Sequence, residues 1–222
     1  MSNKKVLIVV AHQDDETIGC GGAIYQHYLN GDQVFCLSFT DGLSARGIAN
    51  KKILKTRQNS AIKASKILNF KWVENNQVFE DNKLDKYPLL DLIKVIEKAK
   101  IKIKPDIVYT HYFKDLNVDH NAVSMATITA FRPLKNEKCK EILLFEVPSS
   151  TDYSPHQFKP NYYLEISKHW KVKKKALLAY GSEIINQRTS RDLNSLQTFY
   201  KFRGNSVGLK MCESFFIFKK LS

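Results

Sequence analysis

No run of apolar residues in this sequence reaches the ~18 positions that a membrane-spanning helix requires. The apolar run at residues 6–11 meets polar residues after six positions, which is also too short for a signal peptide. Cysteine is scarce, and its four positions, Cys20, Cys36, Cys139 and Cys212, contain no Cys-x-x-Cys pair. This spacing argues against a zinc ribbon or a disulfide framework. We therefore expect a soluble cytoplasmic protein without a membrane span, whose thiols are reduced and buried.

Acidic residues are also in short supply. The chain has 22 Asp and Glu against 35 Lys and Arg, a net charge of +13, with lysines clustered at 51–55, 98–104, 135–140 and 171–175. Such clusters are typical of a solvated surface, although they also attract anionic substrates or nucleic acids. No nucleic-acid-binding motif accompanies the charge, so we expect no nucleic-acid partner.

The chain length of 222 residues, 43% of them hydrophobic, is enough for one well-filled core. Apolar runs of strand length alternate with segments of helical periodicity, which predicts a parallel sheet covered by helices on both faces. We expect an α/β fold: a single Rossmann-like domain over residues 1–222, with a mostly parallel sheet flanked by helices. The expected strands are 5–11, 34–39, 70–73, 106–110, 141–146, 162–166 and 212–218. The expected helices are 17–29, 57–68, 89–103, 119–131, 168–179 and 184–202, and a loop is expected at 41–50.

Two polar clusters follow predicted strands. The first, His12–Glu16, brings a histidine and three carboxylates directly after an apolar strand, and the second lies within residues 110–120. Buried carboxylates are unfavourable unless they are paired or bind a cation. Ligands of parallel α/β sheets bind beyond the carboxyl ends of the strands, so both clusters are expected at the same edge.

These clusters contain the donors of a catalytic zinc site. Such a site uses three protein ligands and leaves a position for water, and His12, Asp15 and His120 make a suitable set. Asp14 would then be free to act as a base. Spacing alone leaves another interpretation open, in which the histidines are core residues and Asp14, Asp15 and Asp119 cap helices.

The segment AHQDDE at 11–16 resembles the AHPDDE signature of the PIG-L/LmbE-type N-acetylglucosaminyl de-N-acetylases. The VDH segment at 118–120 resembles the end of that family's second motif, HPDH, and PDIVYTHYFKDLNVDH resembles the strand and loop before it. Further segments of the C-terminal half resemble sugar-modifying bacterial members: SST at 149–151, AYGSE at 179–183, SR at 190–191, RG at 203–204 and ESFF at 213–216. The resemblance covers nearly the whole chain and implies an LmbE-like domain.

By position, the resemblance implies that His12, Asp15 and His120 are zinc ligands and that Asp14 is the general base. It also implies that Asp119 orients a ligand or a catalytic group.

The resemblance extends to substrate contacts. Arg57 resembles a family arginine that contacts the substrate, and Asp81 matches a substrate-binding position. Arg46 lies in the loop expected at 41–50, where it would contact the sugar or an attached phosphate. The alternatives are a surface arginine at 57, a turn residue at 81 and an ordinary loop charge at 46.

Two positions depart from the family pattern. Gln13 replaces the proline of the first motif, and Asn117 replaces the histidine that opens HPDH. In the family that histidine is expected to stabilise the oxyanion or assist proton transfer. Asn117 can donate a hydrogen bond to an oxyanion but cannot act as an acid. The proton for the leaving amine then comes from Asp14, which we favour, or from His111.

The resemblance predicts a zinc-dependent hydrolase that removes the N-acetyl group of an amino sugar and releases acetate and a free amine. The alternative enzyme is an amidase acting on a thiol–sugar conjugate or another small amide. The expected partner is a small N-acetylated sugar, free or linked to a nucleotide or phosphate, and a homo-oligomer stays open. A dinucleotide-binding protein is disfavoured because GCGG at 19–22 lacks G-x-G-x-x-G spacing.

Overall fold

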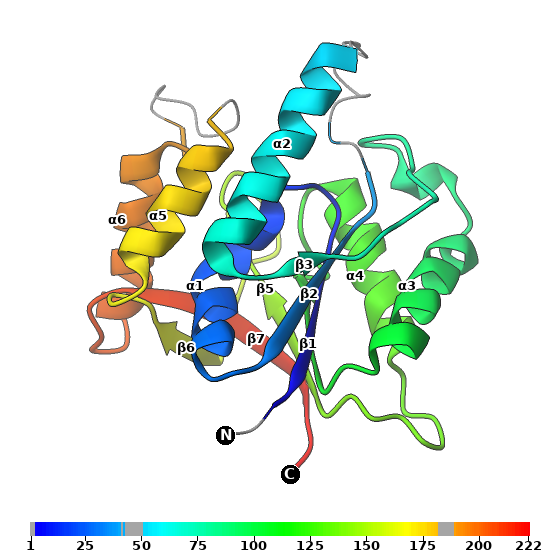
Figure 1. Cartoon of the computed structure of the whole chain (residues 1–222). Helices are drawn as coiled ribbons and strands as arrows, with labels where there is room; N and C mark the ends of the chain where they lie inside the picture. The colour runs from blue at the N-terminus through cyan, green and yellow to red at the C-terminus, as the bar shows by residue number, and fades with distance from the viewer. Residues whose placement is uncertain (1–2, 41, 43–50, 182–188) are drawn as a thin grey trace.

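A seven-stranded sheet forms the centre of the molecule (Figure 1). The computed structural model describes residues 3–40, 42, 51–181 and 189–222. The sheet order is β3-β2-β1-β4-β5-β7-β6; among the described strands, β7 pairs antiparallel with both β5 and β6, and all other pairs are parallel. This arrangement confirms the predicted α/β fold with a mostly parallel sheet. The strands are β1 (Lys5–Val10), β2 (Gln33–Ser38), β3 (Lys71–Trp72), β4 (Ile107–His111), β5 (Glu141–Phe145), β6 (Tyr162–Glu165) and β7 (Cys212–Lys220).

Helices cover both faces of this sheet. Helices α1, α2, α5 and α6 lie on one side and α3 and α4 on the other (Figure 1). Their bounds are α1 (Asp15–Leu29), α2 (Lys51–Leu68), α3 (Leu89–Ile103), α4 (Val118–Ala130), α5 (Trp170–Ala179) and α6 (Leu193–Asn205), with a 3-10 turn η2 (Leu84–Lys86).

The alternation of side chains along β1 divides the core in two. Val6, Ile8 and Val10 pack into the cluster under α1, α2 and α5, while Leu7 and Val9 pack into the cluster under α3 and α4. All five are almost completely buried. A strand buried on both faces reads as a continuous apolar run, as it does here.

Two predicted helix starts need correction. Helix α2 begins at Lys51, six residues before the predicted start, because no proline or glycine between 51 and 57 stops it. Helix α6 begins at Leu193 rather than at 184, because Asp192 caps it by accepting bonds from the backbone N–H groups of Asn194 and Ser195. Residues 182–188 lie outside the described part, as does the predicted loop at 41–50 apart from Gly42.

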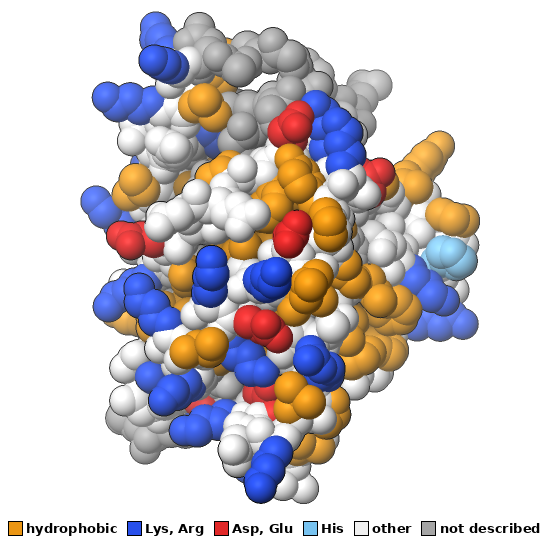
Figure 2. Space-filling model, turned by 90° about the vertical axis from the view of Figure 1, so that its right-hand side faces the viewer, with side chains coloured by type: hydrophobic (Ala, Val, Ile, Leu, Met, Phe, Trp, Pro, Cys, Tyr) orange, Lys and Arg blue, Asp and Glu red, His pale blue; other side chains and the backbone are white. Residues whose placement is uncertain are grey.

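The face that carries α3 and α4 supports the expectation of a solvated, lysine-rich surface. Figure 2 shows that Lys and Arg side chains on this face are interspersed with acidic and apolar ones rather than gathered in one patch. All four cysteines are buried and carry free thiols. Among the described helices, none combines the length and the apolar character needed to cross a bilayer.

The glycines of the GCGG segment serve close packing of α1. A Cβ on Gly19 would lie 2.2 Å from Phe145 Cδ2, and one on Gly22 would lie 2.4 Å from Ile166 Cγ2. Both distances are far below van der Waals contact, so a larger residue would push the helix away from its neighbours. These glycines therefore set the distance between α1 and its packing partners instead of forming a phosphate-binding turn.

A buried ion pair between Lys173 and Glu213 lies beside an irregular turn of α1, where Glu213 accepts two backbone N–H groups. Cys20 leaves the helical conformation, with φ −145° and ψ 24°. The backbone N–H groups of Gly22 and Ala23 donate to the two carboxylate oxygens of Glu213, at 2.6 and 2.8 Å. Lys173 Nζ lies 2.6 Å from the same carboxylate, and both side chains are fully buried. Burial lowers the pKa of Lys173 although the Glu213 carboxylate opposes that shift.

Replacing Lys173 by methionine is expected to lower the free energy of unfolding by about 3–5 kcal/mol, because Glu213 would keep an uncompensated buried charge. Urea denaturation followed by circular dichroism measures the change. Lys174→Met is the matched control, because Lys174 is the exposed neighbour on the same helix and its loss should cost little. Equal midpoints for the two variants would show that the buried pair is energetically neutral.

Candidate active site

The two polar clusters meet at the carboxyl edge of the sheet, as predicted. Strands β1 and β4 are parallel neighbours, with Val9 opposite Thr110, so the segments that follow them start side by side. The first segment supplies His12, Asp14 and Asp15, and the second leads into α4, which carries Asp119 and His120 in its first turn. The pairing of two central strands therefore joins residues that lie more than 100 positions apart.

His12, Asp15 and His120 point one ligand atom each at a common position. His12 Nδ1 and His120 Nε2 lie 3.1 and 3.3 Å from Asp15 Oδ2, and they are 3.3 Å from each other. A tetrahedral zinc ion with bonds of about 2.0–2.1 Å requires ligand atoms about 3.3 Å apart. Asp15 Oδ1 is buried and has no hydrogen-bond partner among the described residues. Both observations fit a metal ion bound by these three side chains.

Carboxylates on the far side of each ring orient the two histidines. His12 Nε2 lies 3.0 Å from Asp81 Oδ1 and 3.2 Å from Asp119 Oδ2. His120 Nδ1 lies 3.3 Å from Asp115 Oδ2. A carboxylate that accepts the N–H of one ring nitrogen leaves the other nitrogen free for a metal and fixes the ring. Asp119 and Asp81 both contact the His12 ring, and the orienting role of Asp119 stays a prediction.

A second group of possible ligands shares His12. Its Nε2 atom lies close to Asp81 and Asp119, and these three side chains also have metal-site spacing. Asp119 is already engaged, because its carboxylate accepts the backbone N–H groups of Asn82 at 2.6 Å and of Leu84 at 2.9 Å. The group that contains Asp15 therefore fits a metal better.

The charges of this cluster favour a cation at its centre. Burial lowers the pKa of His12, but bonds to Asp119 and Asp15 outweigh it, so the pKa lies well above its ordinary value. Burial raises the pKa of Asp15, but the charge of His120 and the bond to His12 bring it well below the ordinary value. A buried group of acids thus draws positive charge to the two histidines, and a divalent ion supplies the same compensation.

Asp14 lies next to this group between two arginines. Its carboxylate oxygens are 3.6 Å from Arg57 Nη2 and 3.5 Å from Arg191 Nη1, and the residue is only 1% exposed. Its φ of 141° is a strained value for a residue other than glycine. Glu16 holds the strained loop by accepting the backbone N–H of Asp14 at 3.0 Å. Burial raises the pKa of Glu16 to about 7.

The predicted substrate residue Arg57 forms a wall of the site. It is 7% exposed, and its Nη2 donates to the carbonyl oxygen of Gln13 at 2.9 Å. Gly42, with φ +66°, lets the chain pass close to this guanidinium, because a Cβ there would lie 2.7 Å from Arg57 Nη2. Substrate contact by Arg57 and by Asp81 stays a prediction. Arg46 lies outside the described residues.

His111 packs against the ligand group, with its Nε2 3.6 Å from Asp15 Oδ2. It is completely buried, its ring stacks on His120 at 4.0 Å, and its Nε2 accepts the backbone N–H of Ala11 at 3.0 Å. Burial and the charge of His120 lower its pKa well below the ordinary value. This position does not support the prediction that His111 donates a proton to the leaving amine.

Asn117 has a structural task that the sequence comparison missed. Its Oδ1 caps α4 by accepting the backbone N–H groups of Asp119 at 2.9 Å and of His120 at 3.3 Å. The side-chain amide N–H groups are the part of Asn117 that can donate to an oxyanion. The cap also sets the start of the helix that carries one candidate metal ligand.

Two contributors to the site were not assigned roles from the sequence. Asp115 lies within the second cluster and contacts the His120 ring. The hydroxyl groups of Ser150 and Thr151 donate hydrogen bonds to the Asp115 carboxylate. Arg191 reaches Asp14 from the segment before α6. Both segments, 110–120 and 190–191, carry part of the family resemblance, but the individual contacts depend on tertiary packing.

Comparisons with known proteins agree with this geometry. The fold is shared with N,N'-diacetylchitobiose deacetylase from Pyrococcus horikoshii (22% identity, TM-score 0.76, covering 97% of this chain and 84% of that one). It is shared with the zinc-inhibited form of teicoplanin deacetylase Orf2 (14% identity, TM-score 0.72, 96% and 97% covered). It is also shared with GalB, a 4-carboxy-2-hydroxymuconate hydratase from Pseudomonas putida KT2440 (20% identity, TM-score 0.73, 99% and 98% covered).

These identities show a common fold, and the hydratase indicates that this fold supports more than one reaction. The sequence is more specific than the fold. Residues 7–131, more than half of the chain, match the model of the PIG-L family, described as GlcNAc-PI de-N-acetylase. This region includes both polar clusters. The chain therefore belongs to the PIG-L family and is an enzyme of the de-N-acetylase class, as its two motifs predicted.

Proposed function

We propose that this protein is a zinc-dependent hydrolase that removes the N-acetyl group from an amino sugar or sugar conjugate. The observation that carries the proposal is the near-equilateral arrangement of His12 Nδ1, Asp15 Oδ2 and His120 Nε2, with sides of 3.1–3.3 Å. When bound, the ion supplies a Lewis acid that polarises the acetyl carbonyl and makes the attacking water more acidic.

The residues around the ligand group divide the remaining work. Asp14 removes a proton from the attacking water and later returns it to the departing sugar nitrogen. Arg57 and Arg191 lie 3.6 and 3.5 Å from its two carboxylate oxygens and fix the position of the group that accepts the proton. Asn117 is the candidate amide donor to the developing oxyanion.

Asp14 is favoured over His111 as the acid because of where the two side chains lie. Asp14 directly precedes the candidate ligand Asp15 and its carboxylate faces two arginines, whereas the Nε2 of His111 accepts the backbone N–H of Ala11. One carboxylate that first accepts and then donates the same proton needs no second titratable group. This single-residue assignment agrees with the loss of the family's second-motif histidine at position 117.

The proposed substrate is an N-acetylated amino sugar or its conjugate, which is more specific than the family assignment alone. A small N-acetylated sugar fits the de-N-acetylase family, and its linkage to a nucleotide or a phosphate is part of the sequence prediction. Action on a thiol–sugar conjugate uses the same residues and is the competing proposal. A single domain over residues 1–222 and a homo-oligomeric state stay predictions.

Acetate release tests the reaction and its metal requirement together. The purified protein is expected to release acetate from N-acetylglucosamine derivatives, to lose activity after chelation, and to regain it when Zn²⁺ is restored. Parallel restoration with Co²⁺, Mn²⁺ and Mg²⁺ identifies the ion, since nitrogen and carboxylate ligands suit zinc better than Mg²⁺. Undiminished activity after complete metal removal would refute the metal dependence, and release from small non-sugar amides alone would refute the sugar substrate.

A further inference from the structure

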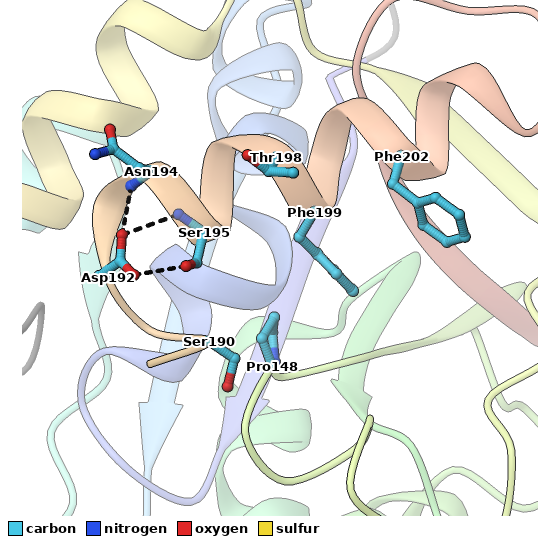
Figure 3. A pocket seen from close by; sticks show the side chains of 8 residues that line it. All are labelled: Pro148, Ser190, Asp192, Asn194, Ser195, Thr198, Phe199 and Phe202. Carbon is cyan, nitrogen blue, oxygen red and sulfur yellow. Dashed lines mark hydrogen bonds between the residues drawn. The ribbon is translucent and has the colours of Figure 1, made fainter. Parts of the chain in front are cut away.

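A pocket of about 850 Å³ lies between the segment at Pro148 and the first turns of α6 (Figure 3). The nearest predicted site residue in the sequence is almost 30 positions before Pro148, and no role has been given to the pocket so far. Its residues come from two separate segments of the C-terminal half, which carries the weaker part of the family resemblance.

The two segments that line this pocket also contact residues of the candidate active site. The two residues that flank Arg191 both line the pocket, while the Arg191 guanidinium lies 3.5 Å from the Asp14 carboxylate. Arg191 Nε also donates to Ser149 Oγ at 2.8 Å, and Ser149 follows Pro148 directly. Ser150 in turn contacts the His120 ring at 3.4 Å. The two segments that contact Asp14 and the His120 ring therefore continue directly into the residues that line the pocket.

The apolar side of the pocket is formed by Pro148, Phe199 and Phe202 (Figure 3). Phe202 is 61% exposed, a high value for a large aromatic side chain. Phe199 and Phe202 lie three positions apart on one face of α6, so their rings line the pocket together. An exposed aromatic surface in a pocket gains free energy when an apolar group covers it.

The other described lining residues are polar, and the carboxylate among them, that of Asp192, is held by hydrogen bonds. The carboxylate of Asp192 accepts the backbone N–H groups of Asn194 and Ser195 at 2.9 and 3.0 Å, and the Ser195 hydroxyl at 2.5 Å. Thr198 adds a further hydroxyl, and no lysine or arginine is among the described residues that line the pocket. Among the described lining residues, the charged side chain is the Asp192 carboxylate, which would repel a phosphate.

We propose that this pocket binds an uncharged, largely apolar aglycone attached to the N-acetylated sugar. The proposal rests on the proposed function, because it names the kind of conjugate that the same site accepts. It predicts that the enzyme prefers N-acetylglucosaminides with an aromatic or alkyl aglycone over the free sugar and over a nucleotide-linked sugar.

Acetate release from three compounds tests this preference: N-acetylglucosamine, p-nitrophenyl N-acetyl-β-D-glucosaminide and UDP-N-acetylglucosamine. Covering one aromatic ring is expected to raise kcat/KM of the nitrophenyl compound about tenfold over the free sugar. Phe202→Ala is expected to reduce that ratio about threefold, since it removes about half of the aromatic contact that gives the tenfold preference. Thr198→Trp should reduce it as well, because the larger side chain fills the pocket.

Phe218→Ala is the matched control, because Phe218 is also exposed (46%) and does not line the pocket. It should keep the wild-type ratio. An unchanged ratio in both Phe202→Ala and Thr198→Trp would overturn the pocket assignment. If the wild type preferred the UDP-linked sugar and Thr198→Trp abolished that preference, the assignment of an uncharged aglycone would be overturned.

A probe without an acetyl group separates this proposal from the proposed function. Binding of phenyl β-D-glucopyranoside is measured by saturation-transfer NMR with the wild type and with Thr198→Trp. Binding that Thr198→Trp weakens supports the pocket even if no acetate is released from any compound, in which case only the proposed function fails. Equal binding to both proteins, or none to the wild type, overturns the pocket.

Discussion

Replacement of Asp14 by asparagine is expected to leave the bound metal in place and to lower kcat by roughly 10²- to 10⁴-fold, the usual contribution of a general base. The amide has the size of the carboxylate but cannot accept the proton of the attacking water. Asparagine is also the safest replacement at this position, because it tolerates the positive φ of 141° better than most residues. Metal analysis and initial rates of acetate release measure the two effects.

Asp85→Asn is the matched control for this variant, because Asp85 is an exposed acid on η2 outside the ligand group. It should keep both the metal and the rate. Wild-type turnover in Asp14→Asn would mean that the proton acceptor is another group. Loss of the metal in Asp14→Asn would instead assign Asp14 to the binding of the ion.

Replacement of His120 by alanine is expected to remove the ion and the activity together. A three-ligand catalytic site holds about one zinc per chain, and it loses an essential donor when one ligand is deleted. The variant also tests which ligand group binds the metal, because His120 belongs only to the group that contains Asp15. Metal content by inductively coupled plasma mass spectrometry, after dialysis against zinc-free buffer, is the measurement.

Two further variants refine this test. Asp115→Asn is expected to weaken metal binding about 10- to 100-fold, because Asp115 orients the His120 ring without touching the ion. His156→Ala is the control, since His156 is exposed and lies outside the ligand groups. If His120→Ala kept its full zinc content and Asp81→Asn lost the zinc, the metal site would have to be reassigned to the group formed by His12, Asp81 and Asp119.

Much of the fold could be predicted because its signals are local. The apolar run at β1 ends where polar residues begin, and the periodicity of α3 predicts its bounds, Leu89–Ile103, without error. The start of α6 could not be placed in the same way. Asp192 caps the start of the helix by accepting hydrogen bonds from two backbone N–H groups, and several other polar residues nearby could have capped it.

The candidate ligands could be predicted for a different reason. His12 and Asp15 lie three positions apart in one motif, and His120 ends a second motif that follows a neighbouring strand. The rule that ligands bind at the carboxyl edge of parallel strands brings these motifs together. The positions of Asn117 and His111 did not follow from this rule. Asn117 caps α4 and His111 accepts the backbone N–H of Ala11, and the rule does not say which polar residue makes such a contact.

By itself, the sequence determined the α/β class, the membership of the PIG-L family and the short list of candidate metal and proton-transfer residues. These depend on periodicity and on motifs of a few adjacent residues. Only the tertiary structure decided that Asp14 lies between Arg57 and Arg191, that Asp115 and Asp119 orient the two histidines, and that a pocket opens beside Arg191. Each of these joins distant segments, and the side-chain contacts that join them form only when the sheet and its helices pack.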